Sequence, residues 1–97
     1  MLMWAVWRLK KRVIQRLLDL GTNVHFYNVY GESVSTYWKM DEGSSVDKQK
    51  LACEIIDLLH EKQVPLNIDS QFSYSIVRRA RENKLNILLV KLQSLGY

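Results

Sequence analysis

Apolar side chains recur at helical spacing in three parts of the chain, with more polar stretches between them. The spacing of three or four residues holds over residues 2–20, returns from about residue 49 to 59, and appears again from about residue 85 to 95. Residues three or four apart share one face of an α-helix, so each stretch predicts an amphipathic helix. Gly21 and Gly96 are expected to end two of these helices, because glycine readily adopts the left-handed conformation of a helix C-terminus.

The same pattern leaves one question open and predicts two further helices. The first stretch forms either one helix or two that meet near residues 9–10, where no glycine marks a bend. Ser33 can cap a helix that begins at the next residue, and Ser75 can cap a helix that runs through about Glu82. Serine is a favoured N-cap because its hydroxyl accepts a hydrogen bond from a free backbone N–H of the first turn.

Three segments between the helical stretches read as turns or loops. Residues 22–31 and 63–73 combine β-branched or aromatic side chains with asparagine, aspartate, glycine or proline. Such residues favour extended segments that end in turns. Residues 41–48 are polar and contain a Gly-Ser-Ser cluster, which predicts a surface loop.

A short sequence occurs three times in the predicted helices. VIQRLLDLG at residues 13–21 recurs as EIIDLLHEK at 54–62 and as LLVKLQSLG at 88–96, so successive copies lie 41 and 34 residues apart. A repeat of about 33 residues with one insertion, placed at residues 41–48, accounts for both spacings. Self-similarity at this period predicts stacked helix-turn-helix units that complete one another's core.

These residues resemble a degenerate ankyrin-repeat protein. Residues 17–24 (LLDLGTNV) match the end of the family's second helix, and residues 28–33 (NVYGES) match its turn, with serine in place of threonine. Residues 70–75 are a second such turn without its glycine, and Ala5 and Ala80 stand at the small position of the first helix. The middle repeat departs from the pattern, because Trp38 occupies that small position, which favours a kink there.

The resemblance implies a single all-α domain over residues 1–97. It is an ankyrin-like stack of about three helix-turn-helix repeats with extended turns, at about residues 1–31, 32–73 and 74–97. The first repeat is incomplete and residues 41–48 form an insertion loop. An irregular helical bundle is the alternative fold.

The resemblance also implies a partner-binding surface, because ankyrin arrays bind proteins with their turn tips and the exposed side of their first helices. The positions carried over include Met40, which is expected to be exposed. The residues expected to bind a partner are Trp7, Arg8, Tyr27, Val29, Tyr30, Glu32, Gln71, Phe72, Tyr74, Arg78, Arg81 and Glu82. Aromatic side chains anchor many protein interfaces. The alternative is that the tip aromatics pack against one another between adjacent turns, and Trp4 and Trp38 are expected in the core.

Charge is unevenly distributed along the chain. The first 30 residues and residues 71–97 each carry a net charge of +4, and the residues between them carry −4, which gives +4 in total. Arg78 and Arg81 lie three residues apart and are expected to share a helix face suited to an acidic partner. Binding of nucleic acid or an anionic surface by the basic flanks is the alternative function. The competing interpretation of those flanks is a solvated end of the stack.

The residues that carry chemistry are sparse. His25 and His60 have no partner at metal-ligand spacing, Cys53 is the single cysteine, and no glycine-rich phosphate loop occurs. We therefore expect no enzyme activity, metal or cofactor. We expect a cytoplasmic protein without a signal peptide or transmembrane segment. Its expected function is protein binding, as in a toxin-neutralising immunity protein or an effector-type binder. Pairing of two copies through exposed repeat ends is a further expectation.

Overall fold

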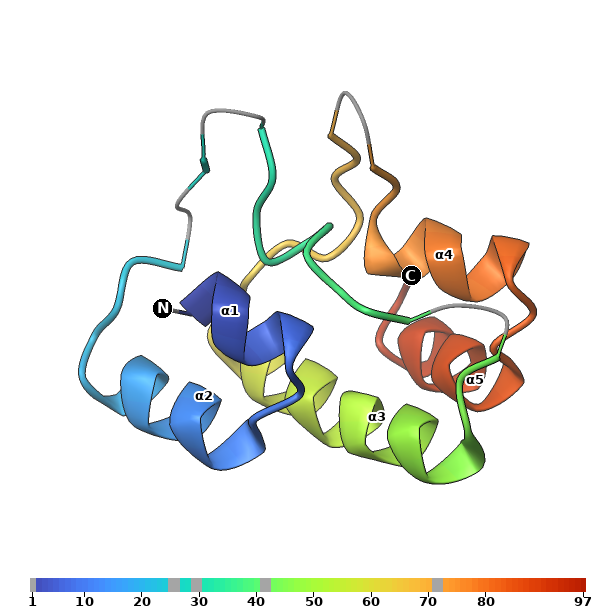
Figure 1. Ribbon diagram of the computed structural model, residues 1–97, viewed down its shortest axis with the longest axis horizontal. Helices are drawn as coiled ribbons and strands as arrows, with labels where there is room; N and C mark the ends of the chain where they lie inside the picture. The colour runs from blue at the N-terminus through green and yellow to red at the C-terminus, as the bar shows by residue number, and fades with distance from the viewer. Residues whose placement is uncertain (1, 25–26, 29–30, 41–42, 71–72) are drawn as a thin grey trace.

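The computed structural model describes residues 2–24, 27–28, 31–40, 43–70 and 73–97. This part of the chain contains five α-helices and no strand (Figure 1), which confirms the all-α prediction. The helices are α1 (Leu2–Trp7), α2 (Lys11–Asp19), α3 (Val46–Glu61), α4 (Ile76–Glu82) and α5 (Asn86–Ser94).

The helices form two layers joined by a non-helical segment. Helix α3 packs between α2 and α5, while α1 packs on α2 and α4 packs on α5 (Figure 1). Residues 33–40 run between α1 and α4, where the Ile76 N–H donates to the Ser35 carbonyl at 2.8 Å. The connections from α2 to this segment and from α3 to α4 rise from the same side of the molecule.

All five helices end in the same way. The second residue after each helix has a positive φ, between 54° and 98°; these residues are Leu9, Gly21, Gln63, Lys84 and Gly96. At the end of α2, the Gly21 N–H donates to the Leu18 carbonyl and the Thr22 N–H donates to the Leu17 carbonyl, both at 3.1 Å. This pair of hydrogen bonds is the Schellman motif, which satisfies the last carbonyl groups of the helix and turns the chain sharply. The glycine stops are therefore confirmed, and Leu9 separates residues 2–20 into two helices.

The predicted helix after Ser33 is wrong. Residues 34–36 form a turn and the chain then runs without helical structure to residue 40. The Ser33 hydroxyl accepts from the Ser35 N–H, and the Thr36 hydroxyl accepts from the Ser33 N–H, each at 3.2 Å. Serine and threonine side chains thus satisfy backbone groups locally and compete with helix formation.

The boundary of the predicted loop 41–48 is also corrected. Helix α3 begins at Val46, and Ser45 caps it by accepting from the Lys48 N–H at 3.2 Å. The helix therefore starts a turn earlier than the apolar spacing indicates, because its first turn contains a single apolar side chain, Val46, and that side chain is exposed. The Ser75 cap of α4 is confirmed, with the Arg78 N–H donating to the hydroxyl at 3.3 Å.

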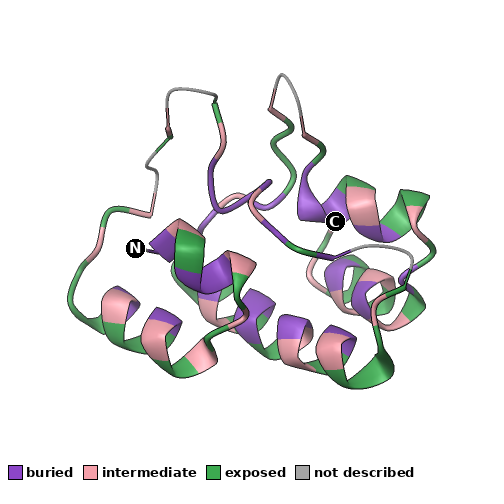
Figure 2. Ribbon diagram, viewed as in Figure 1, coloured by how far each residue is buried: buried purple, intermediate pink, exposed green. Residues whose placement is uncertain are grey.

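The core lies between the two layers and along residues 33–40 (Figure 2). Trp38 is buried there as predicted, with 1% of its surface exposed. Trp4 was expected in the core but is 48% exposed, because among the described helices only α2 packs closely on α1 and it leaves this ring uncovered. Met40 was expected to be exposed but is buried, because residues 37–40 are not helical and alternate between inside and outside.

Candidate functional site

An aromatic and cationic cluster lies where α1 meets the segment 33–40. The Trp7 ring contacts the Tyr37 ring edge-on, with 6.4 Å between centroids. The Arg8 guanidinium lies 5.8 Å and the Lys39 ammonium 5.2 Å from the Trp7 ring centroid. Cations at these distances interact favourably with the indole face. Trp7 is therefore held in place by three neighbours while part of its surface remains accessible.

The extended backbone of residues 37–40 explains why two members of this cluster, Tyr37 and Lys39, lie on the surface. Trp38 and Met40 point into the core, so the alternate side chains of Tyr37 and Lys39 point outward, beside Trp7. Successive side chains of an extended segment point to opposite sides. The buried tryptophan thus fixes the orientation of its two surface neighbours.

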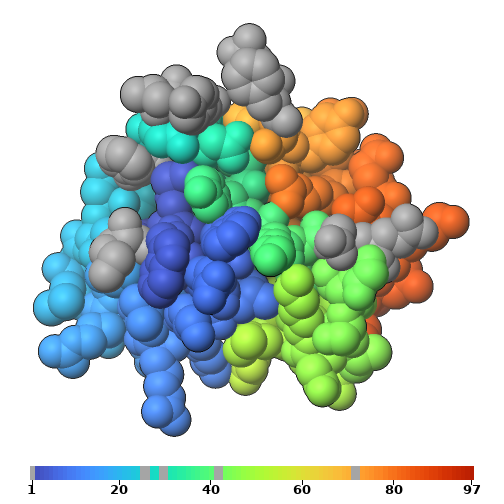
Figure 3. Space-filling view, in the orientation of Figure 1, coloured from blue at the N-terminus to red at the C-terminus, as the bar shows by residue number. Residues whose placement is uncertain are grey.

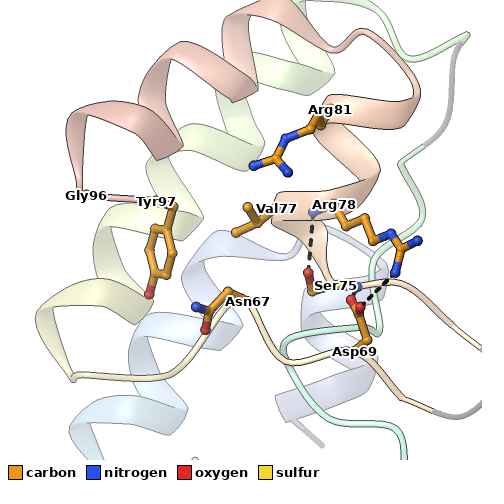
Figure 4. Close-up of a pocket in the computed structure, with 8 residues that line it drawn as sticks. All are labelled: Asn67, Asp69, Ser75, Val77, Arg78, Arg81, Gly96 and Tyr97. Carbon is orange, nitrogen blue, oxygen red and sulfur yellow. Dashed lines mark hydrogen bonds and ion pairs between the residues drawn. The ribbon is translucent and has the colours of Figure 1, made fainter.

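A second cluster lies at the start of α4 (Figure 4). Asp69 accepts from the Ser75 N–H at 2.7 Å and from the Arg78 guanidinium at 3.2 Å. Arg78 lies 3.9 Å from the Tyr74 ring centroid and 3.9 Å from the Glu82 carboxylate. Arg78 is thus bound by one ring and two acids, which restrict it to one orientation on the surface.

Electrostatics at this cluster follow from the same bonds. The Ser75 backbone N–H, and then Arg78, hold the pKa of Asp69 below its ordinary value of 3.8. The hydrogen bond to Asp69 raises the pKa of Arg78. Both groups are charged at neutral pH, so the cluster presents a fixed ion pair under an exposed tyrosine.

The two clusters belong to one continuous surface. The Arg79 guanidinium donates to the Trp38 carbonyl, which ties α4 to the segment that carries Tyr37 and Lys39. Figure 3 shows α1, residues 33–40 and α4 side by side on this face of the molecule. We call the surface formed by Trp7, Arg8, Tyr37, Lys39, Tyr74, Arg78 and Glu82 the first-helix surface.

Other predicted site residues lie apart from this surface. Glu32 is partly buried and accepts from the hydroxyls of Ser70 at 3.2 Å and Thr36 at 3.4 Å, so it connects the two long loops. Tyr27 is 47% exposed. Val29, Tyr30, Gln71 and Phe72 lie outside the described residues.

Arg78 and Arg81 line one hollow of about 350 Å³, together with Asp69, Val77 and Tyr97. Their guanidinium groups point in different directions: Arg78 turns toward Asp69, whereas Arg81 points away from it, on the side of Val77 (Figure 4). The two arginines therefore share one hollow, although among the described residues only Arg78 is held by ion pairs.

Tyr37 and Lys39 are the surface residues that the sequence-based selection missed. The signal that could have identified them is the alternation of Tyr37, Trp38, Lys39 and Met40 between polar or amphipathic and apolar side chains. This alternation has the period of an extended segment, and it was assigned to a helix.

The described residues show little chemistry beyond binding. They contain no group of three or more histidine, cysteine, aspartate or glutamate side chains that could hold a metal ion. Burial raises the pKa of the Cys53 thiol, although Lys91 opposes the shift, so the thiol is protonated at neutral pH and is a poor nucleophile. Among the described helices, none combines the length and the apolar character needed to cross a membrane.

Comparison with known proteins adds no relative. No protein-family model, no curated protein and no solved structure matches this chain. The geometry of the described residues is therefore the basis for assigning a function.

Proposed function

We propose that this chain is a non-catalytic protein-binding module, built as a short stack of about three helix-turn-helix units similar to ankyrin repeats. The first and last units would be the pairs α1–α2 and α4–α5. Their left-handed turn residues Leu9 and Lys84 lie 75 positions apart, as do Gly21 and Gly96. Helices α2 and α5 also match in length, each with nine residues.

The middle unit supports the same architecture with one irregular element. Its second helix is α3, whose left-handed end residue, Gln63, lies 42 positions after Gly21 and 33 before Gly96. The segment 33–40 takes the place of a first helix, between α1 and α4. Trp38 fills this position with a large buried ring, where the outer units bury Ala5 and Ala80 in their first helices.

The observation that carries the binding proposal is Trp7, held between Tyr37, Arg8 and Lys39 on the first-helix surface. Tryptophan, tyrosine and arginine are enriched at the energetic centres of protein interfaces. Their rotamers are restricted before binding, so less conformational entropy is lost when a partner arrives. The two cations beside Trp7 favour a partner with apolar and acidic groups.

The test is capture of a partner from a lysate of the source cells, identified by mass spectrometry. The variants are Trp7→Ala and Lys39→Glu, with Lys50→Glu as the matched control. Lys50 is exposed on α3, so the control has the same change of charge away from the first-helix surface. Circular dichroism would verify that each variant retains its helices.

Two results separate the proposal from its alternative. We expect one protein to be captured at moderate salt by the native chain and the control, and to be lost from both surface variants. Capture of nucleic acid that all four proteins release as salt rises would contradict the proposal. That result would instead support binding by the basic flanks, because phosphate contacts are strongly salt-dependent.

A further inference from the structure

One side of α2 carries an open groove that the first-helix surface does not include. It has a volume of about 390 Å³ and is lined by Arg12, Val13, Arg16, Leu17 and Leu20. Leu20 is 71% exposed, and Val13 and Leu17 are only partly buried. The core-facing side of α2 is formed by Ile14 and Leu18 instead.

The same positions on α5 are covered. Because α2 and α5 have equal lengths and equivalent ends, the groove residues correspond one for one to Ile87, Leu88, Lys91, Leu92 and Leu95. Leu88 and Leu92 are fully buried, whereas their counterparts Val13 and Leu17 are partly exposed. The difference is that α3 packs against α5 at these positions.

Three side chains of α3, spaced four residues apart, contact α5. The Gln49 amide oxygen accepts from the Leu88 N–H at 3.4 Å, which satisfies a backbone donor in the first turn of α5. The Cys53 thiol donates to the Ile87 carbonyl at 3.8 Å. The Asp57 carboxylate pairs with Lys91 at 2.7 Å.

On α2, the groups equivalent to the Leu88 N–H and Lys91 make no such contacts with the described residues. Within the described part of the chain, no side chain accepts from the Val13 N–H, the equivalent of the Leu88 donor, and α2 has no side-chain cap. Among the same residues, Arg16, the equivalent of Lys91, makes no ion pair, and neither does Arg12. As far as the described residues go, the groove therefore offers an apolar floor, one backbone donor without an acceptor and two cations without an ion pair.

We propose that this groove binds an amphipathic, acidic α-helix of another polypeptide, in the way that α3 lies on α5. The helix would carry a side-chain acceptor for the Val13 N–H, a small residue four positions later, and an acid four positions further that pairs with Arg16. Burial of Val13, Leu17 and Leu20 supplies the main stabilisation, and the arginines select for the acid.

A second copy of the chain fits the groove less well. Its free end would present α5, where Val90 stands at the position that corresponds to Asp57 of α3. That position therefore lacks the acid that would pair with Arg16.

The probe is a fluorescent synthetic peptide with the sequence of α3, residues 46–61. A hydrocarbon staple between positions 50 and 54, which are both exposed in the protein, keeps it helical. Binding to the full chain is measured by fluorescence anisotropy. The variants are Arg16→Glu in the protein and Asp57→Lys in the peptide, with Lys62→Glu in the protein as the matched control.

We expect saturable binding of the peptide to the native chain and to the control. Each single charge reversal should weaken binding about tenfold, and the two reversals together should restore it. Restoration requires that position 57 of the peptide meets Arg16, so displacement of the protein's own α3 would not reproduce it. Circular dichroism of Arg16→Glu should match the native spectrum, because Arg16 is exposed.

Other outcomes overturn the proposal. They are an absence of saturable binding, or equal binding of all protein and peptide combinations. Dimerisation of the native chain in sedimentation that Arg16→Glu abolishes would assign the groove to a second copy. Binding to vesicles of anionic phospholipid that Arg16→Glu abolishes, without peptide binding, would assign it to a lipid surface.

Discussion

At the scale of the residue, Trp38 links the core to the first-helix surface. It is fully buried, its indole N–H donates to the Val34 carbonyl at 2.7 Å, and its own carbonyl accepts from Arg79. The side chains of residues 37–40 point alternately inward and outward, so the inward position of this ring also directs Tyr37 and Lys39 outward. A single side chain thus contributes to stability and to the arrangement of the candidate site.

Trp38→Phe tests the role of this residue in stability. The smaller ring leaves a cavity and the Val34 carbonyl loses its donor, so we expect a loss of about 2–4 kcal/mol in the free energy of unfolding. Trp4→Phe is the control and should change it by less than about 0.5 kcal/mol, because Trp4 is half-exposed. Urea denaturation followed by circular dichroism measures both, and equal effects would contradict the assignment.

Asp69 predicts a pH dependence at the same scale. Its pKa is lower in the folded chain than the ordinary value of 3.8, so the carboxylate stabilises the fold above that pH. This stabilisation is lost as the pH falls through the lowered pKa, because the protonated group no longer holds the Ser75 N–H and Arg78 as strongly.

The measurement compares the native chain with Asp69→Asn by urea denaturation across the acid range. We expect the native chain to be more stable by a constant amount above about pH 5, with the difference shrinking below it. Asp19→Asn is the control, since Asp19 is exposed and makes no ion pair among the described residues. A difference that stays constant to low pH would show that Asp69 does not titrate as inferred.

At the scale of the element, the shared helix ending organises the fold. Each helix stops at a left-handed residue, and at Leu9, Gln63 and Lys84 that residue is not glycine. Residues with a β-carbon are strained in this conformation, by roughly 1–2 kcal/mol. The tertiary packing of the helices offsets this strain, because the turns bring α1 onto α2 and α4 onto α5.

Gln63→Gly tests this interpretation. Glycine removes the strain at the left-handed position, so we expect a gain of about 0.5–1 kcal/mol in the free energy of unfolding. The same substitution at Lys50, an exposed position inside α3, should cost about 1 kcal/mol. Urea denaturation distinguishes the two signs, and a loss of stability in both variants would contradict the role assigned to the helix end.

At the scale of the whole molecule, the two ends of the helical assembly differ. The α2 end carries the apolar groove, whereas the opposite end carries Arg81 beside Val77 and Tyr97. In the proposed repeat, Arg81 takes the position of Val6 of α1, 75 residues earlier, which is fully buried. A charged side chain at this end disfavours stacking onto the groove of another copy, as polar end faces do in repeat proteins.

Arg81→Val should weaken this asymmetry. We expect the variant to associate head to tail as its concentration rises, at concentrations where the native chain stays monomeric, because an apolar end can now meet the α2 groove. Glu82→Val is the control, since Glu82 is exposed on the same helix but does not line the hollow that holds Arg81, Val77 and Tyr97. Sedimentation velocity measures the distributions, and association of the native chain or of both variants would contradict the prediction.

The sequence alone determined the features that depend on near neighbours. The helix from about residue 85 to 95, the Ser75 cap and the stops at Gly21 and Gly96 follow from periodicity and backbone preference over a few residues. Tertiary structure decided which side chains are covered. Trp4 is exposed, Met40 is buried and residues 33–40 are not helical, because burial depends on segments distant along the chain.

For the candidate sites too, the sequence identified many of the residues, and the tertiary structure decided which of them lie together. Sequence reasoning selected Trp7, Arg8, Tyr74, Arg78 and Glu82, which the fold places on one surface. It also paired Arg78 with Arg81, and both line one hollow, although Asp69 and Tyr74 hold only Arg78. The sequence determined which side chains are available, and only the tertiary structure decided their neighbours, because contacts form between segments that local preferences do not connect.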